Sequence, residues 1–326
     1  DKIILSKDLN FFSDEIDNLE REITIFLCKI VEKILIENQN QIDLIGFHGQ
    51  TIFHNSIDKI SKQLGDGKLL SQITKKIVVN NFREQDLING GQGAPLTPIF
   101  HKLISNLINK KYKISFPLNI INIGGISNIT QILNNDLTNS NLRAYDISPG
   151  NCLIDRWVRL NSDKNYDKNG EIAKSGKINN LILNQAIDNF AIQSYEKSLD
   201  IKDFDLSFVK GLSLEDGCAT LTEFSAFLIA KGIEEINLKN NIDPTINIIC
   251  GGGRKNSFLI KSIINNMTNQ KSKIKNIDDY DFDGDFIESQ AFGYLAIRTF
   301  LKLPISFPKT TRCKIETVGG TINKNF

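Results

Sequence analysis

The chain has 326 residues, of which 40% are hydrophobic and 24% charged, and its formal net charge is +1. This composition is ordinary for a globular protein, and the length is enough for two packed domains. A near-neutral chain lacks the field that draws proteins to nucleic acid or to membrane surfaces, and no apolar run reaches membrane-spanning length, so we expect neither partner.

The cysteines do not form a metal or disulfide pattern. Five are scattered at positions 28, 152, 218, 250 and 313, without a CxxC pair, and their odd number argues against a disulfide framework. We therefore expect buried thiols in a reducing, cytoplasmic compartment. Three histidines without clustered spacing make a structural zinc site an unfavourable hypothesis, so we predict no metal-ligating residues.

The first ninety residues predict a helix and two strands. A long helix begins at Ser13, and we expect its apolar face to be core: Ile16, Leu19, Ile23, Phe26, Leu27, Ile30 and Ile34. A strand at 42–47 runs into His48-Gly49-Gln50-Thr51, and open α/β sheets place ligand contacts at such carboxyl ends. The alternative is a capped loop with a satisfied histidine.

A glycine-rich stretch follows the second predicted strand, Ile77 to Asn80. Phe82 to Asp86 comes first, and then Gly90-Gly91-Gln92-Gly93-Ala94-Pro95. So much glycine indicates a hinge or a close ligand approach, and we place a domain boundary here. Pro95 is expected to open an amphipathic helix.

The stretch from Asn119 to Asn151 organises the chain. It predicts a strand at 119–123, a Gly124-Gly125 turn, a strand at 127–133, and a third strand ending on Asp146. Paired glycines leave backbone N–H groups free to face an anion, and Asp146 precedes a helix capped by Asn151. A phosphate-sized turn beside a carboxylate suggests phosphoryl transfer. The alternative is an ordinary hairpin and a turn-forming aspartate.

A second glycine turn lies further along. After a helix near 179–193 and another capped by Asp216, a strand at 246–250 leads to Gly251-Gly252-Gly253 and a helix capped by Asn256. Strand, triple glycine and helix are compatible with a nucleotide, although no Walker loop or GxGxxG fingerprint is present. An acidic segment, 278–285, then opens a helix that carries Glu288 and stops at Pro304.

Taken in order, these motifs resemble the anhydro-N-acetylmuramic acid kinase family. The resemblance spans nearly the whole chain and rests on the combined order of five segments: His48-Gly49-Gln50-Thr51, Gly90 to Leu96, Asn122 to Asn128, Asp146 to Asn151, and Cys250 to Gly253.

The resemblance implies an α/β, two-domain, actin-like (ribonuclease H-like) ATPase fold with a cleft between the domains. Domain I would comprise residues 1–94 and 303–326, and domain II residues 95–302. It also implies ATP and Mg²⁺ as cofactors and 1,6-anhydro-N-acetylmuramic acid, a cell-wall recycling product, as the sugar substrate. Whether the protein forms a homodimer is left open.

The site residues follow from matching positions. Asp146 corresponds to the catalytic base, which takes a proton from water as the anhydro ring opens, and the released O6 is phosphorylated. Gly124 and Gly125 would hold phosphate, and Gly251, Gly252 and Gly253 would lie along the adenosine. The resemblance implies sugar contacts from five residues, with Arg83 suited to the lactyl carboxylate: His48, Gln50, Arg83, Asp86 and Glu288.

Some of the family pattern is absent. Nothing in residues 1–40 matches the family's first phosphate loop, and residue 1 is Asp rather than Met, so we expect a fragment of a complete kinase. Leu199-Asp200-Ile201-Lys202 replaces the family's Thr-Gly-Arg-Glu, and Ile147-Ser148 replaces its usual Thr-Gly. Two alternatives are a catalytically silent sugar-binding protein and a kinase of the same fold for another sugar or carboxylate.

Overall fold

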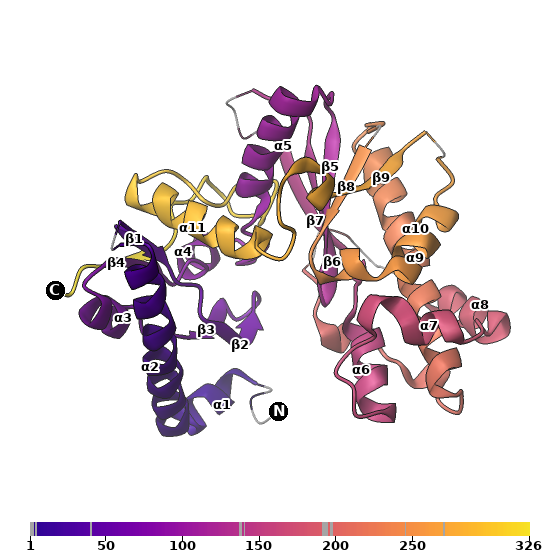
Figure 1. Ribbon diagram of the computed structural model, residues 1–326, viewed down its shortest axis with the longest axis horizontal. Helices are drawn as coiled ribbons and strands as arrows, with labels where there is room; N and C mark the ends of the chain where they lie inside the picture. The colour runs from indigo at the N-terminus through magenta and orange to yellow at the C-terminus, as the bar shows by residue number, and fades with distance from the viewer. Residues whose placement is uncertain are drawn as a thin grey trace. The chain divides into compact units, whose positions relative to one another are not determined.

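The computed structural model describes residues 3, 5–39, 41–136, 139, 141–190, 195, 198–244, 246–269 and 271–326. The chain forms two compact units (Figure 1). Unit 1 comprises Asp1–Phe100 and Glu288–Phe326, and unit 2 comprises His101–Ile287. Both contain sheets and helices, which confirms the α/β class expected from the sequence.

Unit 1 contains a three-stranded sheet in the order β1–β4–β10. Strand β1 (Leu44–Gly46) pairs in parallel with β4 (Ile77–Asn80), and β10 (Thr321–Asn323) pairs antiparallel with β4. The β4 bounds are those predicted, because Val78 and Val79 are fully buried and read as a central strand. Its described helices are α1 (Ser6–Phe11), α2 (Ser13–Glu37), α3 (Gly67–Thr74), α4 (Glu84–Ile88) and most of α11 (Ile287–Phe300).

Unit 1 also contains a hairpin that the sequence patterns did not predict. Strands β2 (Gln50–Asn55) and β3 (Ile60–Leu64) pair antiparallel, so Gln50 and Thr51 begin a strand rather than a loop. Gly49 lies before this hairpin with φ of +74°, and a methyl group there would lie 2.3 Å from the Leu64 carbonyl oxygen. Glycine is therefore required by the fold at this position.

Helix α2 begins at Ser13 as predicted, but its expected core face is largely exposed. Ile16 is buried, whereas Phe26 is 63% exposed. Thr24, Cys28 and Leu35 are buried instead, which shows that the packed side of the helix is turned away from the predicted stripe. The prediction that this stripe is core was wrong for Leu19, Phe26, Ile30 and Ile34.

Unit 2 is built on a five-stranded sheet in the order β7–β6–β5–β8–β9. Strands β5, β6 and β7 form an antiparallel meander, while β8 pairs in parallel with β5 and with β9. Their bounds are Leu118–Ile123 for β5, Ile126–Ile132 for β6, Leu142–Pro149 for β7, Ile246–Cys250 for β8 and Lys273–Asn276 for β9. Strand β8 has the predicted bounds, whereas β7 continues three residues beyond Asp146 to Pro149.

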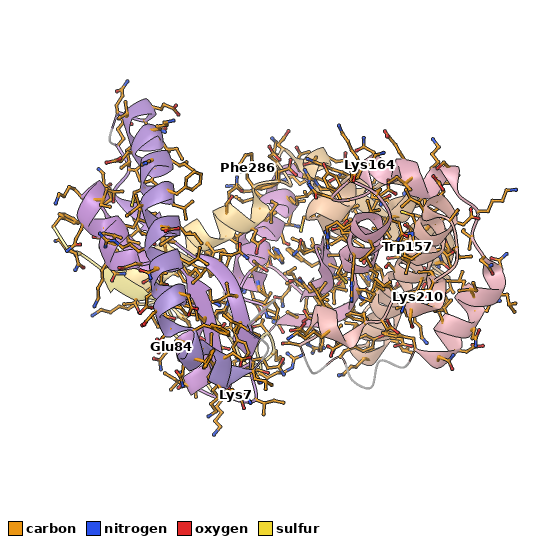
Figure 2. The ribbon with its side chains drawn as sticks, turned by 90° about the horizontal axis from the view of Figure 1, so that it is seen from below. Lys7, Glu84, Trp157, Lys164, Lys210 and Phe286 are labelled. Carbon is orange, nitrogen blue, oxygen red and sulfur yellow. The ribbon has the colours of Figure 1, made fainter. Side chains whose placement is uncertain are left out.

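Helices cover both faces of this sheet. Isoleucines of β5, β6, β7 and β8 pack against α9 (Leu214–Lys239) and α10 (Ser257–Asn266), which lie along the sheet in Figure 1. On the other face α5 (Pro98–Tyr112) contributes His101, whose Nδ1 lies 2.8 Å from the Thr130 hydroxyl. A second core holds Trp157 of α6 (Cys152–Asn161), labelled in Figure 2, together with α7 (Glu171–Ser175) and α8 (Asn180–Asn189).

Several helix starts differ from the sequence prediction. Helix α5 begins at Pro98 rather than Pro95. Helix α9 is capped by Ser213, which accepts a hydrogen bond from the Asp216 N–H, so Asp216 lies in the first turn and is not the cap. Asn256 caps α10 as predicted by accepting from the Leu259 N–H. Residues 191–193 of the predicted helix at 179–193 lie outside the described residues.

The units also divide at other positions than the expected domains, at Phe100/His101 and Ile287/Glu288 rather than at 94/95 and 302/303. Helix α11 accounts for the second difference. Its Phe292 ring lies 4.2 Å from the His48 ring and 5.4 Å from the Phe82 ring, which ties the helix to unit 1. Among the described residues, no helix is both long and apolar enough to cross a lipid bilayer.

Candidate active site

The Gly124-Gly125 turn joins β5 to β6 and directs its backbone donors outward. The carbonyl oxygen of Gly124 accepts from the Asn151 N–H, and that of Gly125 accepts from the Gly150 and Cys152 N–H groups. In a planar trans peptide the N–H points away from the C=O. The N–H groups of Gly125 and Ile126 therefore point away from the start of α6, as an anion-binding turn requires.

Glycine at this turn is not required by the fold. Gly124 and Gly125 both lack a positive φ, and a methyl group at either position would meet no atom closer than 3.6 Å. Only two other glycines of the 22 combine such space with an ordinary φ, namely Gly252 and Gly293. Alanine would fit at either position and would stabilise the protein, because it restricts the unfolded chain. The two glycines therefore leave space that a ligand could occupy.

In the second turn, Gly251 to Gly253, the fold requires two of the glycines, whereas the third has free space around it. Gly251 has φ of +79°, and a methyl group there would lie 2.3 Å from the Asn122 Oδ1 atom. A methyl group at Gly253 would lie 2.3 Å from Cγ2 of Ile123. A methyl group at Gly252 would have no atom within 4 Å apart from its own chain neighbours. The turn after β8 thus packs against the end of β5 and presents Gly252 to open space.

Asp146 lies in a polar row that crosses the sheet. It pairs with Asn128 on β6, Asn128 pairs with Asn122 on β5, and Asn122 pairs with Cys250 on β8. Residues paired across strands share a face, and this face is opposite to the isoleucine core under α9. Asp146, Asn128 and Asn122 are all partly exposed. The register therefore gathers one carboxylate and two amides beside the glycine turns.

A bulge in β7 sets this row apart from the residues that follow. Ser127 pairs with Ser148 while Asn128 pairs with Asp146, so Ile147 has no partner on β6. Ile147 is fully buried, and a methyl group at Gly232 of α9 would lie 2.8 Å from its Cβ. A bulge re-aims neighbouring side chains, and here it buries Ile147 while Asp146 stays partly exposed.

The segment that departs from the family pattern lies against these residues. The Leu199 N–H donates to Oδ2 of Asp146 at 3.0 Å. The side chain of Ile201 lies 3.8 Å from the position that a methyl group on Gly125 would take. A hydrogen bond from a backbone N–H fixes the orientation of the carboxylate.

In unit 1, His48 and Arg83 form a hydrogen-bonded pair. Nδ1 of His48 lies 2.8 Å from the Gly49 carbonyl oxygen and donates to it, so Nε2 is the acceptor for Arg83, whose Nη2 is 3.0 Å away. Nη1 of Arg83 donates to the Gly93 carbonyl oxygen at 2.8 Å. Burial and the Arg83 charge lower the pKa of His48 to about 4, so the imidazole is neutral at neutral pH.

The remaining sugar-site candidates differ in exposure. Asp86 is 1% exposed, and its carboxylate accepts from the Gly93 N–H at 2.7 Å and from the Thr311 hydroxyl at 2.6 Å. Gln50 and Glu288 are exposed. Burial lowers the pKa of Arg83, and the negative charges of Glu288 and Asp86 partly offset this.

Thus the structure brings together two sets of predicted residues. Arg83 and Asp86 both bond to Gly93 in unit 1, and His48 bonds to Arg83. The charge of Glu288 also acts on Arg83. Asp146 and the two glycine turns belong to one sheet of unit 2. Sequence reasoning did not assign roles to Asn122, Asn128, Leu199 or Arg254, although Asn122 and Asn128 lie on either side of the Gly-Gly turn.

Comparisons with known proteins identify similar chains. A model of the family described as "Anhydro-N-acetylmuramic acid kinase" matches residues 10–325. A Pelagibacter ubique protein of that name is 53% identical over 329 residues, which cover 100% of this chain and 86% of that protein. Proteins of the same name from Zymomonas mobilis and Brucella suis are 38% and 35% identical, each over 93% of this chain and over 80% and 79% of their own lengths.

Among solved structures, the activator of the 2-hydroxyisocaproyl-CoA dehydratase from Clostridium difficile with bound ADPNP is similar over 62% of this chain and 67% of that chain. Its sequence identity to this chain is 13% and the TM-score is 0.36.

Proposed function

Because the chain belongs to the anhydro-N-acetylmuramic acid kinase family and is a kinase, we propose that it uses ATP to convert 1,6-anhydro-N-acetylmuramic acid into N-acetylmuramic acid 6-phosphate. This reaction would serve peptidoglycan recycling in the cytoplasm. The observation that carries the proposal is the Gly124-Gly125 turn, with outward N–H groups and room for a ligand, on the same sheet as the Asp146 row.

ATP fits the two turns of unit 2. The N–H groups of Gly125 and Ile126 would donate to the terminal phosphates. Because Gly124 and Gly125 have no side chains, the approach to these N–H groups is open. Gly252 has open space above its Cα, which suits the flat approach of the adenosine, while Gly251 and Gly253 hold the turn in place. ATP supplies the phosphoryl group; the chain orients it.

Asp146 is the proposed general base. Its carboxylate would take a proton from a water molecule whose oxygen bonds to C1 of the sugar, while the bond from C1 to O6 breaks and O6 receives the phosphoryl group. The Leu199 N–H holds one carboxylate oxygen in place, and Asn128, its partner across the strands, offers a polar neighbour for the water. Positioning of this kind is worth orders of magnitude in rate.

Mg²⁺ is expected to accompany the nucleotide. The described residues hold no group of three or more histidine, cysteine or acidic side chains of metal-binding geometry. Mg²⁺ in kinases takes most of its ligands from phosphates and water and only one or two from the protein. The amide oxygens of Asn122 and Asn128 are ligands of the type it prefers, and the ion would neutralise phosphate charge.

The sugar is proposed to bind to unit 1. Arg83 is held by His48 and the Gly93 carbonyl and keeps further N–H groups for the lactyl carboxylate. His48, Gln50 and Glu288 would contact hydroxyl or amide groups. Asp86 has both oxygens engaged by Gly93 and Thr311, so its proposed contribution is to hold the Gly93 loop that supports Arg83.

A coupled ADP-release assay with 1,6-anhydro-N-acetylmuramic acid tests the proposal, on this chain and on one extended upstream. ADP release that depends on the sugar supports it. If neither protein releases ADP while the sugar still raises the melting temperature, the protein binds the sugar without turnover, and the kinase reaction is not its function.

A further inference from the structure

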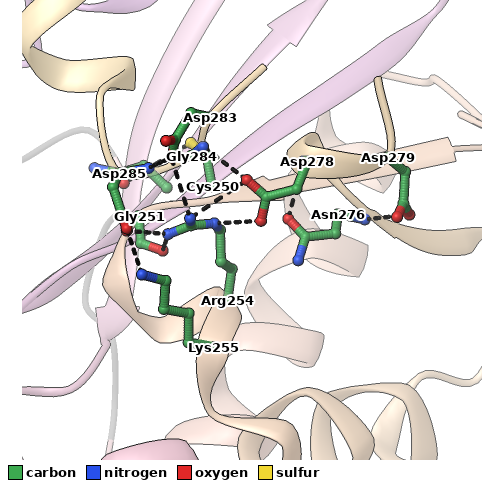
Figure 3. A network of polar contacts seen from close by, with 11 residues as sticks. Cys250, Gly251, Arg254, Lys255, Asn276, Asp278, Asp279, Asp283, Gly284 and Asp285 are labelled. Atoms are coloured by element: carbon green, nitrogen blue, oxygen red, sulfur yellow. Dashed lines mark hydrogen bonds and ion pairs between the residues drawn. The ribbon is translucent and has the colours of Figure 1, made fainter. Parts of the chain in front are cut away.

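Arg254 lies directly after the three glycines and is nearly inaccessible, with a side chain only 2% exposed. Figure 3 shows its guanidinium at the centre of a network of polar contacts. Nε donates to Asp278 at 2.8 Å, and Nη1 donates to Asp285 at 2.8 Å and to the Gly251 carbonyl oxygen at 3.2 Å. One side chain thus joins the glycine turn to two positions of the acidic segment.

The acidic segment is shaped around this guanidinium. The Gly284 N–H donates to Oδ1 of Asp278 at 2.7 Å, and a methyl group at Gly284 would lie 2.1 Å from Nε of Arg254. Lys255 forms an ion pair with Asp285 from the solvent side. Although burial alone would raise the pKa of Asp278, hydrogen bonds from Arg254 and Gly284 lower it overall.

A buried arginine of this kind is poorly explained by stability alone. Removing a guanidinium from water is costly, and a buried ion pair returns little net stability compared with apolar packing. What arginine offers is a rigid, planar set of donors that fixes several acceptors at once. Here those acceptors are the carbonyl of Gly251 and the carboxylates of Asp278 and Asp285.

Arg254 joins the Gly251–Gly253 turn, which is proposed to bind the nucleotide, to the acidic segment, which leads into helix α11. The turn presents Gly252, the open glycine of this turn. The acidic segment ends at Asp285, and Phe286 separates it from helix α11, which carries Glu288.

We propose that Arg254 is a positioning residue for the nucleotide: it holds the Gly251–Gly253 turn against the acidic segment so that Gly252 stays open to the adenosine. The role rests on the proposed function, because it assumes that ATP occupies this turn. Arg254 acts through the turn and does not itself touch the nucleotide. Its loss should impair ATP binding while sugar binding remains intact.

The test compares Arg254→Met and Arg254→Lys with Lys255→Met, in the full chain. Lys255→Met removes the same charge from the neighbouring, half-exposed position and serves as the matched control. We expect KM for ATP to rise roughly tenfold in Arg254→Met and less in Arg254→Lys, with KM for the sugar within about twofold of wild type. Lys255→Met should leave both constants nearly unchanged.

If Arg254→Met fails to fold, Arg254→Lys and the nearly isosteric Asp285→Asn carry the test, since both keep polar groups in the network. Unchanged KM for ATP in the folded variants overturns the proposal. An equal rise in both KM values together with a lower melting temperature also overturns it, because that result indicates a purely structural role.

Failure of the proposed function is distinguishable. If wild type releases no ADP, ATP affinity measured by titration calorimetry replaces KM as the readout. Wild type that binds ATP while Arg254→Met binds it roughly tenfold more weakly supports the positioning role even without turnover. Wild type that does not bind ATP overturns both.

Discussion

The turn after β5 and the turn after β8 both consist of consecutive glycines, but the glycines serve different purposes. Gly124 and Gly125 have ordinary backbone angles and space for a methyl group, so the fold would accept alanine at either position. Gly251 and Gly253 are confined by β5, whose Asn122 and Ile123 stand within 2.3 Å of a methyl group at those positions. The first turn leaves space that the fold does not fill, whereas the second is shaped mainly by what it packs against.

The strongest test of this comparison is Asp146→Asn, because Asp146 is the proposed general base beside the first turn. The two side chains are nearly isosteric, so the fold should be intact, whereas loss of a general base lowers turnover by about 10²–10⁴-fold. The measurement is kcat from ADP release, with Asp188→Asn on the exposed surface of α8 as the control. A variant that keeps most of the wild-type turnover would show that Asp146 is not the base.

Substitution of a confined glycine should act on stability. In Gly253→Ala the new methyl group would lie 2.3 Å from Cγ2 of Ile123, and overpacking of this kind costs about 1–3 kcal/mol. Urea denaturation measures the loss, with Gly252→Ala as the matched control in the same turn. Equal stability of the two variants would remove the distinction between confined and open glycines.

Acid sensitivity between pH 7 and pH 5 should come from buried histidines, since a carboxylate with a lowered pKa, such as Asp278, loses its contribution to stability only below about pH 4. Burial lowers the pKa of His101 to about 3, well below its unfolded value near 6.5. Between these values the unfolded chain binds the proton and the folded chain does not. The contribution of His101 to the free energy of unfolding is therefore fully present above about pH 6.5 and is lost as the pH is lowered toward 3.

At pH 5 the expected loss of unfolding free energy from His101 is about 2 kcal/mol, and His48, with its pKa near 4, acts in the same direction. Urea midpoints at pH 7 and pH 5 measure it. The difference should shrink in His101→Gln; if it does not, the acid sensitivity has another origin.

The smallest expected effect is also the most specific to the first turn. Gly124→Ala should raise stability slightly, by about 0.4–1 kcal/mol, because alanine restricts the unfolded chain and fits the folded one. The same methyl group would obstruct phosphate, so KM for ATP should rise roughly tenfold. A variant that gains stability and keeps its KM would mean that no ligand approaches Gly124.

Local patterns in the sequence were sufficient for the elements with strong signals. Strands β4 and β8 are short, buried and β-branched, and α2 starts where Ser13 and two acids favour a helix start. The exposed stripe on α2 could not be foreseen, because periodicity identifies an apolar face but not what covers it. The grouping of helix α11 with unit 1 could not be read from local patterns for a similar reason, since its partners His48 and Phe82 are distant in sequence.

The candidate site was predictable as motifs but not as an arrangement. Glycines and Asp146 stand out in the sequence, whereas the row from Asp146 to Asn128 and Asn122 depends on a strand register with a bulge at Ile147. A one-residue shift would reverse the faces of these side chains, and no local pattern fixes the register that closely. Asp86 illustrates the converse, since its buried bonds to Gly93 and Thr311 are invisible in the sequence.

The hydrogen bonds between α6 and the first turn have an electrostatic consequence. The N–H groups at the start of α6 are not themselves free for an anion, because Gly150, Asn151 and Cys152 donate to the turn's carbonyl oxygens. Hydrogen-bonded peptide groups polarise one another, so the partial positive charge at the start of the helix strengthens the outward N–H donors of Gly125 and Ile126. The dipole of the ten-residue helix α6 thus acts at the outer side of the turn, through the hydrogen-bonded peptide groups between them. A phosphate there would be attracted without any basic side chain.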